Sequence, residues 1–222
     1  MTAAPAASDL RPSASTLRAR VAAASAAPGR RGPGLAARAA GLRGDHDLDP
    51  ALRPAGPLVP AAVLVPVVDG PDGLAVLLTR RTAHLNAHAG QISFPGGRFD
   101  PEDADAAACA LRESQEEIGL DPARVEILGR LDTYLIRTGY RVTPVVGLVT
   151  PPLALRADPF EVEEIFQVPL DFVIDPRNRE RRSRDVDGTR RDFWAIPYGG
   201  YFIWGATAGM LVNLSDVLLG QS

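Results

Sequence analysis

The sequence predicts an α/β fold in which helices cover both faces of a mixed β-sheet. Apolar runs of strand length, such as residues 61–68 and 141–149, lie on both sides of one acidic, helix-forming stretch. A second helix, from Trp204 onward, closes the chain with an apolar stripe of Leu211, Leu214, Val217 and Leu218. Strands that bracket one helix and are followed by another suit an α/β/α sandwich.

The length predicts one domain with a complete core and an additional N-terminal segment. The chain has 222 residues, which is enough for both. Residues 1–50 are rich in Ala, Arg and Pro and are expected to be a partly helical extension, and residues 51–222 are expected to be the folded domain. A helix is predicted from Thr16 to Ala27, with Ser15 as its cap. An Arg-rich, acid-poor start also resembles an organelle transit peptide, which is the alternative.

Charge and composition indicate which kinds of molecule the protein is suited to bind. All 24 basic residues are Arg, and residues 1–44 carry a net charge of +6 against −9 for the remainder. An acidic body suits a metal site and does not suit general nucleic-acid binding. No apolar run is long enough to span a bilayer, and no apolar signal-peptide region follows the start. We therefore expect a cytoplasmic protein with no membrane partner and, with one cysteine, no internal disulfide.

The chain order predicts a hairpin before the acidic helix and further strands after it. Residues 61–68, the turn 69–73 and residues 74–79 form the hairpin, which places Arg80 and Arg81 at a strand end. A loop through residue 88 and a short strand at 92–94 follow. After the helix we expect strands at 125–135 and 141–149, a strand running into Pro169, a mobile excursion over 175–192, and strands at 193–197 and 201–203 that resume the sheet.

The acidic helix is predicted from Asp103 to Ile118, with Gly119 as a left-handed C-cap. Glu113, Glu116 and Glu117 stand at i, i+3 and i+4, so their carboxylates share one face. Like charges at this spacing repel, and Arg112 alone does not balance them. Oxygen ligands favour Mg²⁺ or Mn²⁺ over zinc, so we expect a divalent cation. The alternative is a solvated acidic face. Cys109, near that face, is interpreted as a packed residue rather than a nucleophile.

These residues resemble the Nudix box, G-x5-E-x7-R-E-U-x-E-E-x-G-U, in which U is aliphatic. Arg112, Glu113, Glu116, Glu117, Gly119 and Leu120 match it position by position. Counted from Gly97, Asp103 replaces the first Glu, one extra residue precedes Arg112, and Ser114 replaces an aliphatic residue. The upstream run is similar to the coenzyme A pyrophosphatase branch of the family. It comprises Leu77-Leu78-Thr79-Arg80, Leu85, His88 and Gly90-Gln91-Ile92-Ser93-Phe94-Pro95-Gly96-Gly97.

The resemblance implies a set of site residues. Metal ligands are expected at Gly97, Glu113, Glu116 and Glu117, and Arg112 is expected to orient a catalytic Glu. An acid outside the box would act as base or additional ligand; Glu163 is the leading candidate, and Glu161 and Glu164 are also open. Substrate contacts are expected from Arg80, Arg81, His88, Gln91, Ser93 and Phe94. A zinc pair of His84 and His88 is disfavoured, because no third ligand is evident.

The resemblance also implies a reaction. Coenzyme A and its thioesters would be hydrolysed at the diphosphate to 4′-phosphopantetheine, or its acyl form, and 3′,5′-ADP, with Mg²⁺ or Mn²⁺ activating water. A homodimer is compatible with the resemblance. One alternative is a Nudix pyrophosphatase for ADP-ribose, NADH or another nucleoside diphosphate derivative. The other is a non-catalytic nucleotide sensor, which the Asp103 replacement keeps open.

Overall fold

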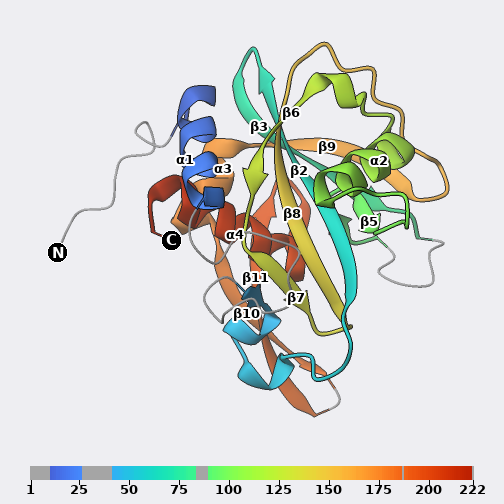
Figure 1. The fold of residues 1–222 in the computed structure, drawn as a ribbon. Coiled ribbons are helices and arrows are strands. Elements are labelled where there is room, and N and C mark those ends of the chain that lie inside the picture. The colour runs from blue at the N-terminus through green and yellow to red at the C-terminus, as the bar shows by residue number, and fades with distance from the viewer. Residues whose placement is uncertain (1–10, 27–41, 84–89, 187, 222) are drawn as a thin grey trace.

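The computed structural model describes residues 11–26, 42–83, 90–186 and 188–221. Within these residues, nine strands form one mixed sheet and three more form a second, smaller sheet (Figure 1). The strands of the main sheet are β1 Leu42–Gly44, β2 Val59–Gly70, β3 Gly73–Arg81, β4 Ile92–Ser93, β5 Gly96–Arg98, β6 Val125–Arg130, β7 Thr133–Ile136, β8 Tyr140–Val149 and β9 Val162–Pro169. The α-helices are α1 Ala14–Ala26, α2 Ala106–Ile118, α3 Leu170–Ile174 and α4 Gly205–Leu219.

The strands β2 and β8 form the parallel centre of the main sheet, aligned from Val59 opposite Tyr140 to Val68 opposite Val149. Strand β3 returns antiparallel to β2, which confirms the predicted hairpin. Residues of β2 alternate between two cores, as a strand buried on both faces requires. Ala61, Val65 and Val67 pack with α1, α3 and α4, whereas Ala62, Leu64 and Val68 pack with α2. The predicted α/β/α sandwich is therefore confirmed.

The two ends of α2 follow the chemistry of its sequence. The carboxylate of Asp105 accepts hydrogen bonds from the backbone N–H groups of Ala107 and Ala108, both at 2.9 Å, so the helix begins at Ala106 rather than at the predicted Asp103. Gly119 has a φ of 65° and ends the helix in the left-handed conformation, as predicted. The closing helix α4 is also confirmed, and its apolar stripe is buried.

The N-terminal helix α1 packs against the same core as the rest of the chain. Leu17 and Val21, four residues apart, are fully buried, and the hydroxyl of Ser25 accepts a 2.7 Å hydrogen bond from the backbone N–H of Arg130 in β6. The expectation that Ser15 caps this helix is wrong. The helix begins at Ala14, and Ser13 accepts the capping hydrogen bond, from the N–H of Thr16.

Three predictions for the second half of the chain need correction. Residues 125–135 form two strands, because the chain leaves the ladder at Asp132, whose N–H donates to Asn213 of α4 at 2.9 Å. The expected excursion contains a strand, β10 Glu180–Val186, paired with β11 Thr189–Tyr198. Together with β12 Tyr201–Trp204 these strands form the separate second sheet instead of resuming the first. The charged residues of β10 are exposed, so hydrophobic alternation does not mark it.

Candidate active site

The backbone of β5 lies directly against the acidic helix α2. In β5, Gly96 pairs with Val63 of β2, and Gly97 pairs with Ala62. A Cβ atom at Gly97 would lie 2.5 Å from the carboxylate carbon of Glu113, and Gly96 has a φ of 151°, which L side chains rarely adopt. Gly97 therefore lets the strand lie against the Glu113 carboxylate in its present position, whereas Gly96 is needed for its own backbone conformation and for close pairing with β2.

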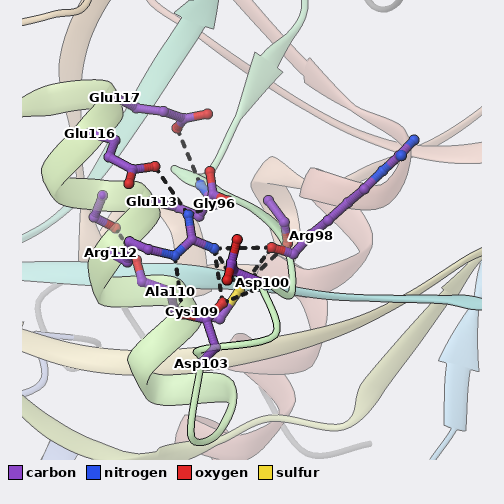
Figure 2. Close-up of polar contacts among 12 residues, drawn as sticks. Gly96, Arg98, Asp100, Asp103, Cys109, Ala110, Arg112, Glu113, Glu116 and Glu117 are labelled. Atoms are coloured by element: carbon purple, nitrogen blue, oxygen red, sulfur yellow. Dashed lines mark hydrogen bonds and ion pairs between the residues drawn. The ribbon is translucent and has the colours of Figure 1, made fainter.

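Arg112 connects α2 to the loop that precedes it (Figure 2). Its guanidinium binds Asp103 with two hydrogen bonds, from Nε to Oδ1 at 3.1 Å and from Nη2 to Oδ2 at 2.9 Å. Nη1 donates to Glu113 at 2.9 Å and to Glu116 at 3.0 Å, and Nη2 also donates to the carbonyl of Arg98 at 3.1 Å. The hydrogen bonds from Arg112 lower the pKa of Asp103 to about 2. Arg112 therefore holds three carboxylates and closes the loop between β5 and α2.

Glu117 is the most deeply buried of the three helix glutamates. Its residue surface is only 4% exposed, and its Oε2 accepts a 3.2 Å hydrogen bond from the N–H of Gly96. Nη1 of Arg81 is 3.8 Å from Oε1, too far for a hydrogen bond. Burial raises the pKa of Glu117 to about 8. The site therefore contains a desolvated carboxylate whose nearest cation, Arg81, does not hydrogen-bond to it.

Glu161, on the turn before β9, also belongs to this acidic cluster. Its Oε2 is 3.9 Å from Nη2 of Arg81, and its negative charge adds to the raised pKa values of Glu113 and Glu117. Exposure differs strongly along α2, with side-chain values of 5% for Glu117, 19% for Glu113 and 61% for Glu116. The carboxylates of Glu117 and Glu161 thus lie beside Arg81 and that of Glu113 lies beside Arg112, whereas Glu116 extends toward solvent.

A family model described as the NUDIX domain matches residues 58–186, which contain β5, α2 and the Glu161 turn. The chain belongs to the Nudix hydrolase family. It is 43% identical over 155 residues to the "Uncharacterized Nudix hydrolase NudL" of Escherichia coli, covering 70% of this chain and 80% of that protein. The protein of the same name from Shigella boydii is 42% identical over the same length, with the same coverage.

The solved structures that resemble this Nudix hydrolase are more distant in sequence. A MutT/nudix family protein from Enterococcus faecalis is 17% identical and aligns with a TM-score of 0.46, covering 74% of this chain and 63% of that one. Nudix hydrolases act on nucleoside diphosphate derivatives and use divalent metal ions. The matched region contains the carboxylate cluster on α2, which makes this cluster the candidate active site.

The Nudix box residues of this chain suit a hard divalent cation. Among the residues that the structure describes, no three His, Cys, Asp or Glu side chains are already arranged to hold a metal ion; Glu113 and Glu116 are bound by Arg112 instead. The donor set is nevertheless appropriate, because carboxylate oxygens are the ligands that Mg²⁺ prefers. Glu113 and Glu117 are desolvated and their pKa values are raised, so a nearby cation would stabilise their charged forms.

The residues expected to contact substrate lie in different environments. Arg80 and Arg81 end β3, as predicted, but Arg80 pairs with Glu164 at 3.2 Å whereas Arg81 lies beside Glu117 and Glu161. Gln91 and Ser93 are half-buried near β4. Phe94 is 3% exposed and packs in the core with α1, α3 and α4, on the face of the sheet opposite α2. His84 and His88 lie outside the described residues.

The three acids outside the Nudix box are also separated by the structure. Glu161 lies beside Arg81, and together with burial its negative charge raises the pKa of Glu113 and Glu117. Glu163 is exposed at an irregularity in the pairing of β3 with β9, and Glu164 accepts a 2.6 Å hydrogen bond from the hydroxyl of Tyr201. Cys109 is fully buried, and burial raises the pKa of its thiol to about 12. These features confirm Cys109 as a packed residue.

The sequence alone does not predict that Asp103 binds Arg112. The residue stands where the box usually has Glu, and it was recognised only as a departure from the pattern. Its position as the bidentate partner of Arg112 depends on the turn at Asp100, whose N–H donates to Asp103 Oδ2 at 2.8 Å. The turn chemistry of Asp100-Pro101 was a signal for this arrangement.

Proposed function

We propose that this Nudix hydrolase cleaves the diphosphate of coenzyme A and acyl-coenzyme A, giving 4′-phosphopantetheine, or its acyl form, and 3′,5′-ADP. The observation that carries the proposal is the position of Arg81. It belongs to the strand of the upstream signature and lies 3.8 Å from Glu117 and 3.9 Å from Glu161. A cation held this loosely among carboxylates is available to bind an anionic substrate.

Mg²⁺ or Mn²⁺ would be held by Glu113, Glu116, Glu117 and the backbone of Gly97. When bound, the ion would neutralise charge on the diphosphate oxygens and would lower the pKa of a bound water. Arg112 orients Glu113 and Glu116 through its hydrogen bonds, and Arg81 binds a phosphate oxygen. The apolar core beneath α2 keeps water away from Glu117, which strengthens its electrostatic interactions.

Glu161 is the acid that we assign to accept the proton of the attacking water. Together with burial, its negative charge raises the pKa of both Glu113 and Glu117, and its position on a turn leaves the side chain 49% exposed. Glu164 is less suited, because Arg80 and Tyr201 already bind its two oxygens. Glu163 is less suited because its side chain is exposed at the irregularity between β3 and β9. The cytoplasmic location and the homodimer stay predictions.

The test is hydrolysis of coenzyme A, ADP-ribose and NADH with Mg²⁺ or Mn²⁺, with products separated by chromatography. We expect preferential release of 3′,5′-ADP from coenzyme A. The same measurement on Glu161→Gln and Glu163→Gln, identical changes two residues apart, tests which of the two acids is the general base. Only Glu161→Gln should lower kcat, by about 10²-fold or more.

Other outcomes point to the alternatives. Turnover of ADP-ribose or NADH alone would retain the mechanism and reject coenzyme A as substrate. Nucleotide binding without turnover of any of the three compounds would favour a sensor. The presence of Arg112 and all three helix glutamates argues against that last outcome.

A further inference from the structure

Phe160 is an aromatic side chain that the chemistry described so far does not use. It is 81% exposed, by far the largest value among the exposed large hydrophobic residues of the described chain. The next is Phe202 in β12, at 41%. A single exposed apolar residue is common on protein surfaces, so exposure alone assigns no role to Phe160.

The backbone that carries Phe160 is held by several hydrogen bonds. Its N–H donates to the carboxylate of Asp158 at 2.7 Å, and its carbonyl accepts from the hydroxyl of Thr82 at 2.8 Å. The N–H of Thr82 donates to the carbonyl of Glu161 at 3.0 Å, and Thr82 itself is 5% exposed. The exposed ring is thus attached to an ordered turn. An aromatic group presented in this way loses little entropy on binding a ligand.

The same turn is joined to the catalytic cluster from two sides. The N–H of Asp158 donates to the carbonyl of Glu117 in α2 at 2.8 Å. Thr82, which binds the turn, directly follows Arg81. Phe160 also directly precedes Glu161, whose carboxylate faces Arg81. The turn that carries the ring therefore lies at the border of the acidic cluster and is held by contacts that also fix the cluster.

We propose that Phe160 is the platform on which the base of the nucleoside diphosphate substrate stacks. The inference rests on hydrolysis of such a substrate at the α2 carboxylates, whichever derivative it is. In these compounds one ribose separates the base from the diphosphate, so a ring beside the diphosphate site is within reach of the base. Phe160 has no polar group on its ring. Its contact is with the face of the base, which tolerates different bases.

Kinetics on four variants test the proposal. Phe160→Ala should raise KM about tenfold for the substrate that the enzyme hydrolyses, with kcat changed by less than about twofold. Phe160→Tyr keeps the aromatic face and should retain the KM, whereas Phe160→Leu should behave like Phe160→Ala. Phe202→Ala removes an exposed phenylalanine from the second sheet and should change neither constant. A normal KM for Phe160→Leu or for Phe160→Ala would overturn the stacking platform.

A binding measurement tests the proposal without turnover. Phe160→Trp introduces a fluorophore at the platform, and its emission is compared with that of the wild type and of Phe202→Trp, because Trp194 and Trp204 contribute to all three. We expect AMP and 3′,5′-ADP to quench the new emission and 4′-phosphopantetheine, which has a phosphate but no base, to leave it unchanged. Quenching by 4′-phosphopantetheine alone, or by none of them, would reject the proposal. An enzyme that does not hydrolyse coenzyme A would still show quenching by AMP and 3′,5′-ADP if the base stacks on Phe160, so this test is separate from the test of the substrate.

Discussion

Arg112 and Arg81 both lie among the acids of this site, but their contacts differ. Arg112 makes hydrogen bonds of 2.9–3.1 Å to Asp103, Glu113 and Glu116 and to the Arg98 carbonyl. Arg81 is 3.8 Å from Glu117 and 3.9 Å from Glu161. Arg112 binds each of its three carboxylates directly and fixes the loop before α2; we call this set the Arg112 cluster. Arg81 contacts its two carboxylates only at longer range, so in this Arg81 cluster the guanidinium stays available for a substrate phosphate and the carboxylates for a metal ion.

The largest expected effect is on catalysis, from the Arg81 cluster. Glu117→Gln removes the buried charge with almost no change of shape, so kcat/KM should fall about 10³-fold. The metal-free variant should be at least as stable as the wild type at pH 7, because folding obliges Glu117 to take up a proton that the unfolded chain has released, and Gln has no such cost. Glu126→Gln on β6 is the control and should retain activity. A Glu117→Gln enzyme with more than a tenth of wild-type kcat/KM would contradict the assigned role.

The Arg112 cluster should contribute more to stability. Arg112→Ala leaves the buried Asp103 carboxylate without its bidentate partner, and we expect a loss of about 2–3 kcal/mol in the free energy of unfolding. Arg81→Ala breaks only long contacts and should cost less than about 1 kcal/mol while raising KM. Urea denaturation of both variants measures the contrast. Equal losses of stability would mean that the two clusters do not differ as their geometry indicates.

Periodicity made the main sheet and the acidic helix predictable. The alternation of β2 between two cores and the caps of α2 are local properties of the sequence. Two features were harder to find. The exposed β10 carries charges on both faces and has no hydrophobic pattern. Leu17 and Val21 lie in an Ala-rich helix whose burial depends on β6 and α4, which are distant in sequence.

The site was predictable as a set of carboxylates but not as an arrangement. Helical spacing placed Glu113, Glu116 and Glu117 on one face, yet their exposures range from 5% to 61%. That range results from the packing of β5 along the edge of the face that carries Glu113 and Glu117, a tertiary contact that spacing does not encode. The choice of Glu161 over Glu163 likewise depends on the turn bound to Thr82 and Glu117.

The Arg81 and Arg112 clusters should also differ in how their contributions to the free energy of unfolding change with pH. Burial raises the Glu117 pKa from 4.5 to about 8, so the folded metal-free protein keeps a proton that the unfolded chain releases. Stability should therefore fall as pH rises from about 4.5 to about 8. The pKa of Asp103 is lowered to about 2, so its contribution is complete above about pH 4 and is lost below. Thermal unfolding at a series of pH values, with a chelator present, measures both effects. Glu117→Gln should remove the loss of stability between about pH 4.5 and pH 8 and leave the loss below about pH 4 as it is. An unchanged loss between about pH 4.5 and pH 8 would exclude Glu117 as its source.

The smallest effect on stability is expected for Glu116, which belongs to the Arg112 cluster but is largely exposed. Glu116→Gln removes a 3.0 Å ion pair at i,i+4 spacing, so the free energy of unfolding should change by less than about 0.5 kcal/mol. As a proposed metal ligand, however, Glu116 should affect the Mn²⁺ concentration that gives half-maximal activity. A several-fold rise in that concentration, with unchanged urea denaturation, would show that one side chain serves both clusters. An unchanged metal requirement would confine Glu116 to the surface of the Arg112 cluster and leave Glu113, Glu117 and Gly97 as the proposed ligands.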